Sequence, residues 1–134
     1  MEFAVEHIGL AANDPVSLKN WYMQVLNARL VLDTGQSPPA FFIELPGGCC
    51  LEIYKGDSSC METQNNRLAG WRHIALRVAS VDEARRELSD RGIEFRETVK
   101  PAGGGGRILF FQDPEGNLLH LVERPDSSPV RPKL

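Results

Sequence analysis

Two short stretches decide how this chain folds: Cys50-Leu51-Glu52-Ile53-Tyr54 and Leu118-Leu119-His120-Leu121-Val122. In each stretch, one polar residue stands between two aliphatic residues. Because side chains alternate between the two faces of a β-strand, the aliphatic pair can pack on a core while the polar residue points the other way. The two stretches therefore predict strands that carry Glu52 and His120 on the face away from the core.

Two further matched segments lie upstream, His7-Ile8-Gly9-Leu10 and His73-Ile74-Ala75-Leu76. Their histidines are 66 positions apart (73 − 7), and Glu52 and His120 are 68 positions apart (120 − 52). Near-equal offsets at both ends of a segment indicate an internal duplication. The chain has three histidines, and all three fall on the polar faces of these predicted strands.

The remaining elements follow the same order in both halves. Apolar periodicity, caps and turn residues predict strand, helix and three further strands in each half. In the first half the strands are expected at 3–11, 29–34, 40–45 and 49–54, with a helix at 15–26. In the second half they are expected at 71–78, 93–97, 107–112 and 118–123, with a helix from Val81 to the stop at Gly92. We expect one domain over residues 1–134: module one at 3–54, a linker at 55–70, module two at 71–124 and a tail at 125–134.

Composition restricts the class of protein. Hydrophobic residues make up 42% and charged residues 25% of the 134 residues, as in an ordinary globular domain. The net charge is −3 and no basic block is present, so nucleic acid is not an expected partner. No apolar run approaches the roughly 20 residues of a membrane span, and the first residues do not resemble a signal peptide. A cytoplasmic protein without a membrane partner is the expectation.

The cysteines agree with a reducing compartment. Cys49, Cys50 and Cys60 make an odd number, and the neighbouring pair points to opposite strand faces, so no disulfide framework is predicted. Cys50 shares a predicted strand face with Glu52.

With these residues in place, the chain resembles the vicinal oxygen chelate superfamily, which includes glyoxalase I, bleomycin-resistance proteins and extradiol dioxygenases. The resemblance covers residues 3 to 124. It rests on His-Ile-Gly-Leu at 7–10, the helix with Trp21-Tyr22, Leu51-Glu52-Ile53, His-Ile-Ala-Leu at 73–76, and Asp113-Pro114-Glu115-Gly116-Asn117 before Leu119-His120-Leu121. It implies an α+β fold in which two tandem βαβββ modules form a curled mixed sheet with helices outside.

The resemblance also implies a metal site. The glyoxalase I ligand positions fall on His7, Glu52, His73 and His120. The first three match the bacterial pattern, whereas the family usually has glutamate at the position of His120. Glu123 lies nearby but on the opposite strand face, so we place it outside the site. Imidazole and carboxylate ligands suit a divalent Zn, Ni, Fe, Mn or Cu ion, and the residues do not choose among these.

What the resemblance implies for activity is a metal-dependent lyase or isomerase of the glyoxalase I type. Its substrate would be a small molecule with vicinal oxygens, and its chemistry a proton transfer. Because the family's usual base position holds His120, Glu52 is the candidate catalytic carboxylate. Two alternatives stay open: a metal-dependent (di)oxygenase with a three-His-one-Glu site, and a non-catalytic small-molecule binding or resistance protein.

Glutathione is not expected to be the part of the substrate that the protein binds. Bacterial glyoxalases that resemble this chain usually carry an arginine four residues after the first histidine and an asparagine four residues after the first glutamate. Ala11 and Gly56 stand there, and the loss of a guanidinium from a carboxylate-binding site is not a neutral change. Arg77, on the predicted face of His73, could instead meet an anionic group.

Association is also expected. In small members of the family, one site is often completed by halves from different chains. We therefore expect a homodimer in which His7 and Glu52 of one chain meet His73 and His120 of the other.

Overall fold

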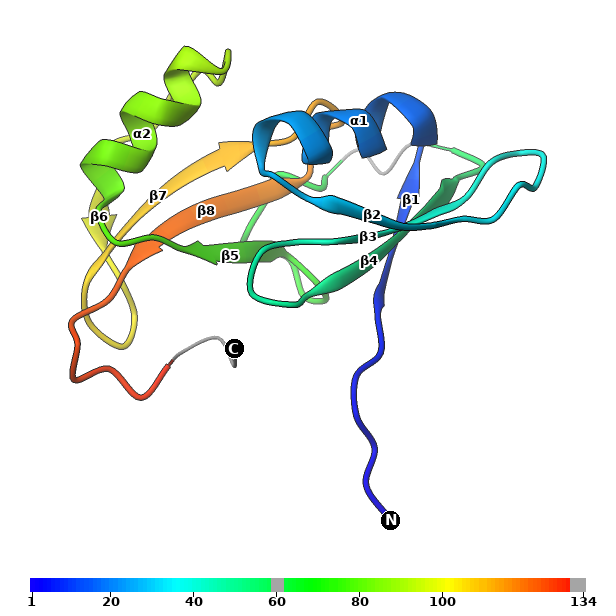
Figure 1. Cartoon of the computed structure of the whole chain (residues 1–134). Helices are drawn as coiled ribbons and strands as arrows, with labels where there is room; N and C mark the ends of the chain where they lie inside the picture. The colour runs from blue at the N-terminus through cyan, green and yellow to red at the C-terminus, as the bar shows by residue number, and fades with distance from the viewer. Residues whose placement is uncertain (59–61, 131–134) are drawn as a thin grey trace. The chain divides into compact units, whose positions relative to one another are not determined.

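The structure, a computed structural model, describes residues 1–58 and 62–130. It divides into two compact units, each with four strands and one helix. Figure 1 shows both units in the order of the chain, and each is described separately below.

The first unit contains β1 (Ile8–Ala12), α1 (Pro15–Val25), β2 (Arg29–Asp33), β3 (Phe41–Glu44) and β4 (Cys50–Lys55). Its sheet has the order β1-β4-β3-β2, with β1 parallel to β4 and the other pairs antiparallel. The first and last strands of the unit are therefore neighbours. The register places Gly9 beside Glu52 in β1 and β4, and Phe42 beside Glu52 in β3 and β4.

Helix α1 begins where the sequence predicts it. Asp14 caps the helix by accepting a hydrogen bond from the Ser17 amide at 3.1 Å, and Pro15 occupies the first turn. The helix buries Leu18, Tyr22 and Val25. The strand face beneath it buries Phe41, Ile43, Leu51 and Ile53. Glu52 therefore points to the face opposite α1, as the alternation predicts.

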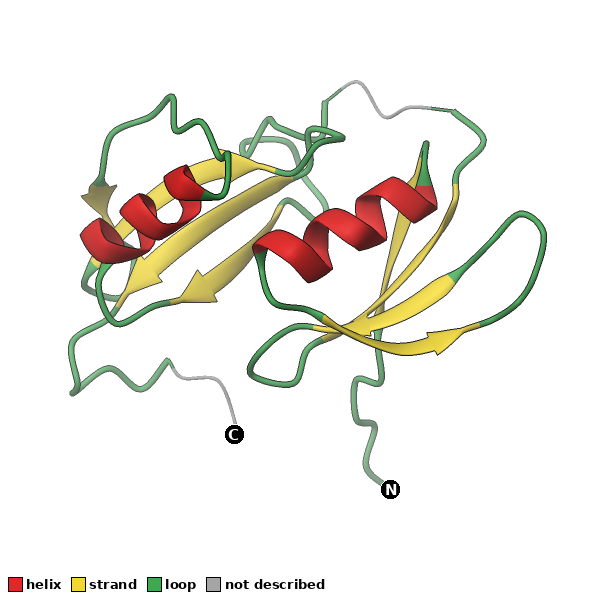
Figure 2. Ribbon diagram, turned by 45° about the horizontal axis from the view of Figure 1, so that its top comes forward, coloured by secondary structure: helices red, strands yellow, loops and turns green. Residues whose placement is uncertain are grey.

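The second unit contains β5 (His73–Arg77), α2 (Val81–Asp90), β6 (Lys100–Pro101), β7 (Arg107–Gln112) and β8 (Leu118–Glu123). Its sheet order, β5-β8-β7-β6, repeats the first unit, and β5 is parallel to β8. Ser80 caps α2 by accepting from the Glu83 amide at 3.2 Å. Figure 2 shows that each helix covers one face of the sheet of its own unit.

The predicted α+β class and the βαβββ order of each half are confirmed, with one four-stranded mixed sheet per unit. No helix among residues 1–58 and 62–130 is long and apolar enough to cross a membrane.

Two strand predictions were wrong in extent or place. Residues 93–97 form no strand; the Phe95 ring packs on Phe111 at 5.5 Å between centroids, so packing alone accounts for the apolar pattern there. The short strand β6 lies further along, at Lys100–Pro101. In the first unit, β1 begins at Ile8 because its ladder with β4 begins at Ile8 and Leu51. The expected strand at 3–7 is absent, and His7 lies directly before β1.

Candidate metal site

His7 and Glu52 lie together in the first unit. The distance between His7 Nε2 and Glu52 Oε1 is 4.0 Å, and the two side chains are 33% and 31% exposed. Phe42, beside Glu52 in the ladder, meets the His7 ring edge-on at 5.1 Å between centroids. An imidazole and a carboxylate therefore lie close together, both partly exposed, beside the ring of Phe42.

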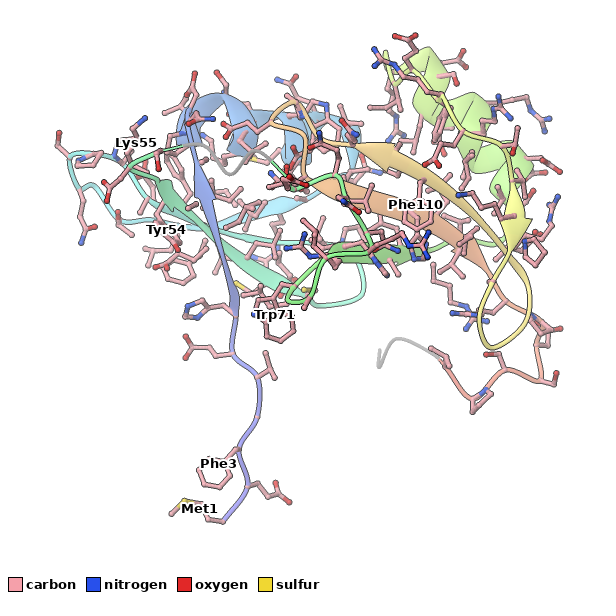
Figure 3. The ribbon with its side chains drawn as sticks, turned by 180° about the vertical axis from the view of Figure 1, so that it is seen from behind. Met1, Phe3, Tyr54, Lys55, Trp71 and Phe110 are labelled. Carbon is pink, nitrogen blue, oxygen red and sulfur yellow. The ribbon has the colours of Figure 1, made fainter. Side chains whose placement is uncertain are left out.

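A glycine shapes the same surface. A Cβ at Gly9 would lie 3.3 Å from Tyr54 Cε1, tighter than an ordinary van der Waals contact. The missing side chain therefore lets the Tyr54 ring lie close over β1. Tyr54, labelled in Figure 3, is two residues from Glu52 on the same strand face.

The second unit brings His73 and His120 together. Their ring centroids are 4.6 Å apart. Phe110 stands beside His120 in the β7–β8 ladder, 4.9 Å from the His120 ring and 5.9 Å from the His73 ring. Two imidazoles therefore meet around one phenyl ring.

Phe42 and Phe110 lie beside the ligand candidates, and the sequence did not single them out. Phe42 and Phe110 are 68 positions apart (110 − 42), the same offset as Glu52 and His120. Each stands beside a ligand candidate in its ladder and packs edge-on against a histidine. The equal offset was the signal that could have found them.

All three histidines are oriented in the same way. In each, Nδ1 lies within hydrogen-bond distance of an oxygen: Glu6 Oε1 at 2.9 Å for His7, Asn66 Oδ1 at 2.7 Å for His73, and the Leu121 carbonyl at 3.1 Å for His120. These oxygens only accept hydrogen bonds, so Nδ1 donates in each ring and Nε2 is the nitrogen that remains for another partner. Metal-ligating histidines usually have this second interaction.

His120 is the most buried of the three, at 5% exposure. Burial lowers the pKa of His120, the hydrogen bond to the Leu121 carbonyl opposes this, and His73 and Arg124 add to the lowering. The imidazole is therefore neutral at neutral pH, which is the form that binds a metal ion.

As a donor set, three imidazoles and one carboxylate fit a divalent transition-metal ion. The described residues contain no group of three or more His, Cys, Asp or Glu side chains that could hold an ion. The ligand candidates instead form one pair in each unit, His7 with Glu52 and His73 with His120.

The other residues singled out from the sequence have different neighbours. Glu123 accepts a hydrogen bond from Arg107 Nε at 2.9 Å, and Arg107 also reaches Asp82 at 3.2 Å. The Arg77 guanidinium donates to the Val130 carbonyl at 2.7 Å, an interaction with the tail.

The cysteines and the two positions linked to glutathione are placed as follows. Cys49 is exposed and Cys50 half-buried, neither is in a disulfide, and burial raises the pKa of both thiols. Cys60 lies outside the described residues. A Cβ at Gly56 would lie 3.4 Å from the Cβ of Ala11, so these two positions are neighbours without a charge.

A lysine lies against the phenyl ring that the second pair shares. The Lys100 ammonium sits 5.3 Å from the centroid of Phe110, the ring that contacts both histidines of this unit. It also pairs with Glu97 at 3.2 Å. Figure 3 labels Phe110 on its strand.

Comparison with known proteins identifies the family of this chain. A model of the Glyoxalase/Bleomycin resistance protein/Dioxygenase superfamily matches residues 4–121. The chain belongs to this superfamily. The resemblance drawn from its strand motifs and histidines is therefore confirmed.

Relatives and solved structures agree with this assignment. The chain is 27% identical over 124 residues to the uncharacterized protein YwkD of Bacillus subtilis, covering 90% of this chain and 97% of that protein. It is 28% identical over 124 residues to the fosfomycin resistance protein FosX of Listeria monocytogenes, covering 87% and 86%.

A crystal structure of a FosX mutant with Mn(II) and 1S,2S-dihydroxypropylphosphonic acid matches with a TM-score of 0.69 at 23% identity, covering 94% of both chains. A superfamily domain from Frankia matches with a TM-score of 0.72 at 21% identity, covering 95% and 96%. At these identities the structural matches establish the fold.

Proposed function

We propose that this protein is a divalent-metal-dependent lyase or isomerase that moves a proton on a small molecule with vicinal oxygens. The proposed ligands are His7, Glu52, His73 and His120. The observation that carries the proposal is the shared orientation of the histidines, each with Nδ1 bonded to an oxygen and Nε2 left for an ion.

Each ligand has one role in this proposal. A divalent ion would supply Lewis-acid polarisation of two adjacent substrate oxygens. Glu52 is the proposed general base, because it is the carboxylate beside the histidines and about a third of its side chain is exposed. His120 replaces the usual glutamate with a neutral ligand, so it leaves the proton transfer to Glu52.

The substrate class follows from the charges nearby. Lys100 places an ammonium beside the ring that contacts His73 and His120, which favours a substrate with an anionic group. The neighbouring Ala11 and Gly56 offer no charge to a glutathione carboxylate, so glutathione is not the proposed handle. FosX, a relative, is described with Mn(II) and a dihydroxyphosphonate, a ligand that combines vicinal oxygens with an anion.

Assembly and location belong to the same proposal. We propose a cytoplasmic homodimer of a single two-module domain, with sites that join His7 and Glu52 of one chain to His73 and His120 of the other. Support comes from the distribution of the four ligand candidates, because each unit holds two of them as a pair.

The deciding experiment is metal analysis of freshly purified protein, followed by titration of metal-free protein with Mn(II), Ni(II), Zn(II) and Fe(II). We expect about one ion per chain. His73→Ala and His120→Ala are expected to lose it, whereas Glu44→Gln, a carboxylate paired with Arg29 in the same sheet as Glu52, keeps it. Unchanged metal content in His120→Ala would refute the ligand set.

Activity is tested on the metal-loaded protein with α-ketoaldehydes, epimerisable acids, catechols and fosfomycin. The expected signature is exchange of a substrate carbon-bound proton for deuterium from D₂O, reduced about 10²–10⁴-fold in Glu52→Gln. Oxygen consumption with catechols would instead establish the oxygenase alternative. Tight binding of a compound without turnover would establish the binding or resistance alternative.

A further inference from the structure

Residues 62–72, the bracket, form a folded segment directly before β5, although the sequence predicts a linker for most of it. The Asn65 amide donates to the Glu62 carbonyl at 3.2 Å, and the Leu68 amide donates to the Asn65 carbonyl at 3.4 Å. The Asn65 Oδ1 accepts from the Arg67 amide at 3.0 Å. Hydrogen bonds within the segment therefore give its backbone a definite course.

Arg72 closes the bracket at the end nearest to β5. Its Nη1 donates to the carbonyls of Glu62 and Asn65, each at 3.3 Å. One guanidinium nitrogen therefore joins two backbone carbonyls that lie ten and seven residues back in the chain. His73 follows Arg72 directly, so the bracket is closed beside the first residue of β5.

The bracket is also anchored to the turn that leads into β8. Thr63 Oγ1 donates to the Gly116 carbonyl at 2.9 Å, and a Cβ at Gly116 would lie 3.5 Å from the same hydroxyl. The carboxylate of Asp113 holds this turn by accepting from the amides of Glu115 and Asn117 at 2.9 and 3.0 Å. Since β8 begins directly after the turn, the bracket is fixed against a well-bonded part of the second unit.

The side chain that the bracket brings to a ligand candidate is Asn66. Its Oδ1 lies 2.7 Å from His73 Nδ1. Both residues are exposed, so water competes for this hydrogen bond, and an unrestrained asparagine would hold the ring weakly. The bonds of Thr63 and Arg72 restrain the backbone on either side of Asn66, which lowers the entropy lost when the side chain meets the ring.

The first unit makes the same kind of contact differently. There the acceptor for His7 Nδ1 is Glu6, the residue directly before it. His73 takes its acceptor from seven residues upstream. The second unit therefore uses a folded segment for a contact that the first unit makes between adjacent residues.

We propose that Asn66 is a positioning residue for His73 and that the bracket holds Asn66 at the ring. The inference rests on the proposed function in one respect, namely that His73 is a metal ligand. Asn66 accepts the Nδ1 proton, so Nε2 is the nitrogen left for an ion. Thr63 and Arg72 act on His73 through Asn66.

Nitrogen-15 NMR of the metal-free protein at about pH 8.5, where imidazoles are neutral, tests the positioning without reference to a metal. In the wild type we expect the His73 ring proton on Nδ1. Asn66→Ala removes the acceptor, so we expect the ring to populate both tautomers. Asn66→Asp keeps an oxygen acceptor, and we expect it to restore the wild-type spectrum. Circular dichroism of each variant checks that it is folded.

Titration with Mn(II) measures the consequence for an ion. Asn66→Ala is expected to weaken binding about 10–100-fold, and Asn66→Asp to restore it. Thr63→Val removes the anchor to Gly116 and is expected to weaken binding by a smaller factor. The matched controls are Asn20→Ala in α1 and Thr34→Val, which removes a hydroxyl-to-carbonyl bond of the same 2.9 Å length in the first unit. Both controls are expected to bind as the wild type does.

A double-mutant cycle tests whether the anchor acts through Asn66. If it does, Thr63→Val weakens metal binding in the wild-type background and changes nothing further in Asn66→Ala. Unchanged binding in Thr63→Val alone, or multiplicative effects in the combined variant, would overturn the role of the anchor.

Two results would overturn the positioning itself: a His73 spectrum that Asn66→Ala leaves unchanged, or an Asn66→Asp variant that behaves like Asn66→Ala. The two proposals fail separately. A wild type that binds no metal, while its His73 tautomer depends on Asn66, refutes the proposed function alone. A wild type that binds metal, with an affinity and a His73 tautomer insensitive to Asn66→Ala, refutes the positioning alone.

Discussion

The two units hold equivalent positions in different surroundings. In the first unit, Glu52 is a carboxylate whose side chain is 31% exposed, beside a partly exposed His7. In the second unit, the equivalent His120 is buried beside His73 and Phe110. A charged carboxylate has a low desolvation cost where water reaches it, whereas a buried position favours a neutral group. The duplicated fold therefore assigns the charged residue to the open position and the neutral one to the closed position.

The strongest test of the duplication concerns the cores. Leu51 and Leu119 are both fully buried on the helix-facing side and are 68 positions apart (119 − 51). Leu51→Ala and Leu119→Ala are each expected to lower the free energy of unfolding by about 2–5 kcal/mol. Urea denaturation of metal-free protein measures both. A loss below about 1 kcal/mol at either position would show that the two cores are not equivalent.

An exchange of the two polar residues sharpens the comparison. His120→Glu puts a carboxylate in a buried place, and we expect it to cost about 1–3 kcal/mol in metal-free protein at pH 7. Glu52→His changes a partly exposed site and is expected to cost less than about 1 kcal/mol. Urea denaturation with a chelator present measures both variants.

The pH dependence of the unfolding free energy of His120→Glu shows why this variant is destabilised. A buried carboxyl at position 120 has a folded pKa above its unfolded value of about 4.3, so the unfolded state releases its proton first. The penalty is therefore largest at neutral pH and shrinks as the pH falls toward about 5. A penalty that is equal at both ends of this range would point to a steric cause instead.

The smallest expected difference is between the two helix caps. Hydrogen bonds from the Ser17 amide and hydroxyl lower the pKa of Asp14 in the folded state. Its contribution is fully present above the unfolded value near 3.8 and is lost as the pH falls through the lower folded pKa. The Ser80 cap has no charge, so Ser80→Ala costs about 1 kcal/mol at any pH. Asp14→Ala is expected to destabilise more at pH 7 than at about pH 2, as measured by urea denaturation; an equal loss at both would contradict the titration.

Local pattern was sufficient for most of the fold. In β4 the alternation around Glu52 predicted the strand faces correctly, because Leu51 and Ile53 are buried and Glu52 is partly exposed. In β8 the pattern predicted the strand but not the burial of His120, since all residues from Leu118 to Val122 are buried. The segment 93–97 failed because alternation reports burial of side chains, whereas a strand also needs a neighbour for its backbone. The start of β1 failed for the same reason, since it depends on where β4 begins.

Only part of the candidate site could be predicted from the sequence. Spacing identified the histidines and Glu52, because an internal duplication repeats, at near-equal offsets, the polar residues that interrupt its apolar strands. Phe42 and Phe110 were missed because an aromatic residue in an apolar strand is indistinguishable by type from a core residue. The acceptors of the Nδ1 protons, Glu6 and Asn66, lie outside the motifs; Glu6 directly precedes His7, whereas Asn66 reaches the His73 ring only in the folded chain.

The parallel pairing of first and last strands has a consequence for folding. His7 and Glu52 are 45 residues apart (52 − 7), and His73 and His120 are 47 apart (120 − 73). Contacts of such high sequence separation close long loops, and they form slowly compared with helices and hairpins. A nascent or truncated unit that lacks β4 or β8 contains only one member of its ligand pair. The appearance of each pair during refolding therefore marks the completion of a whole unit, not the formation of any single element.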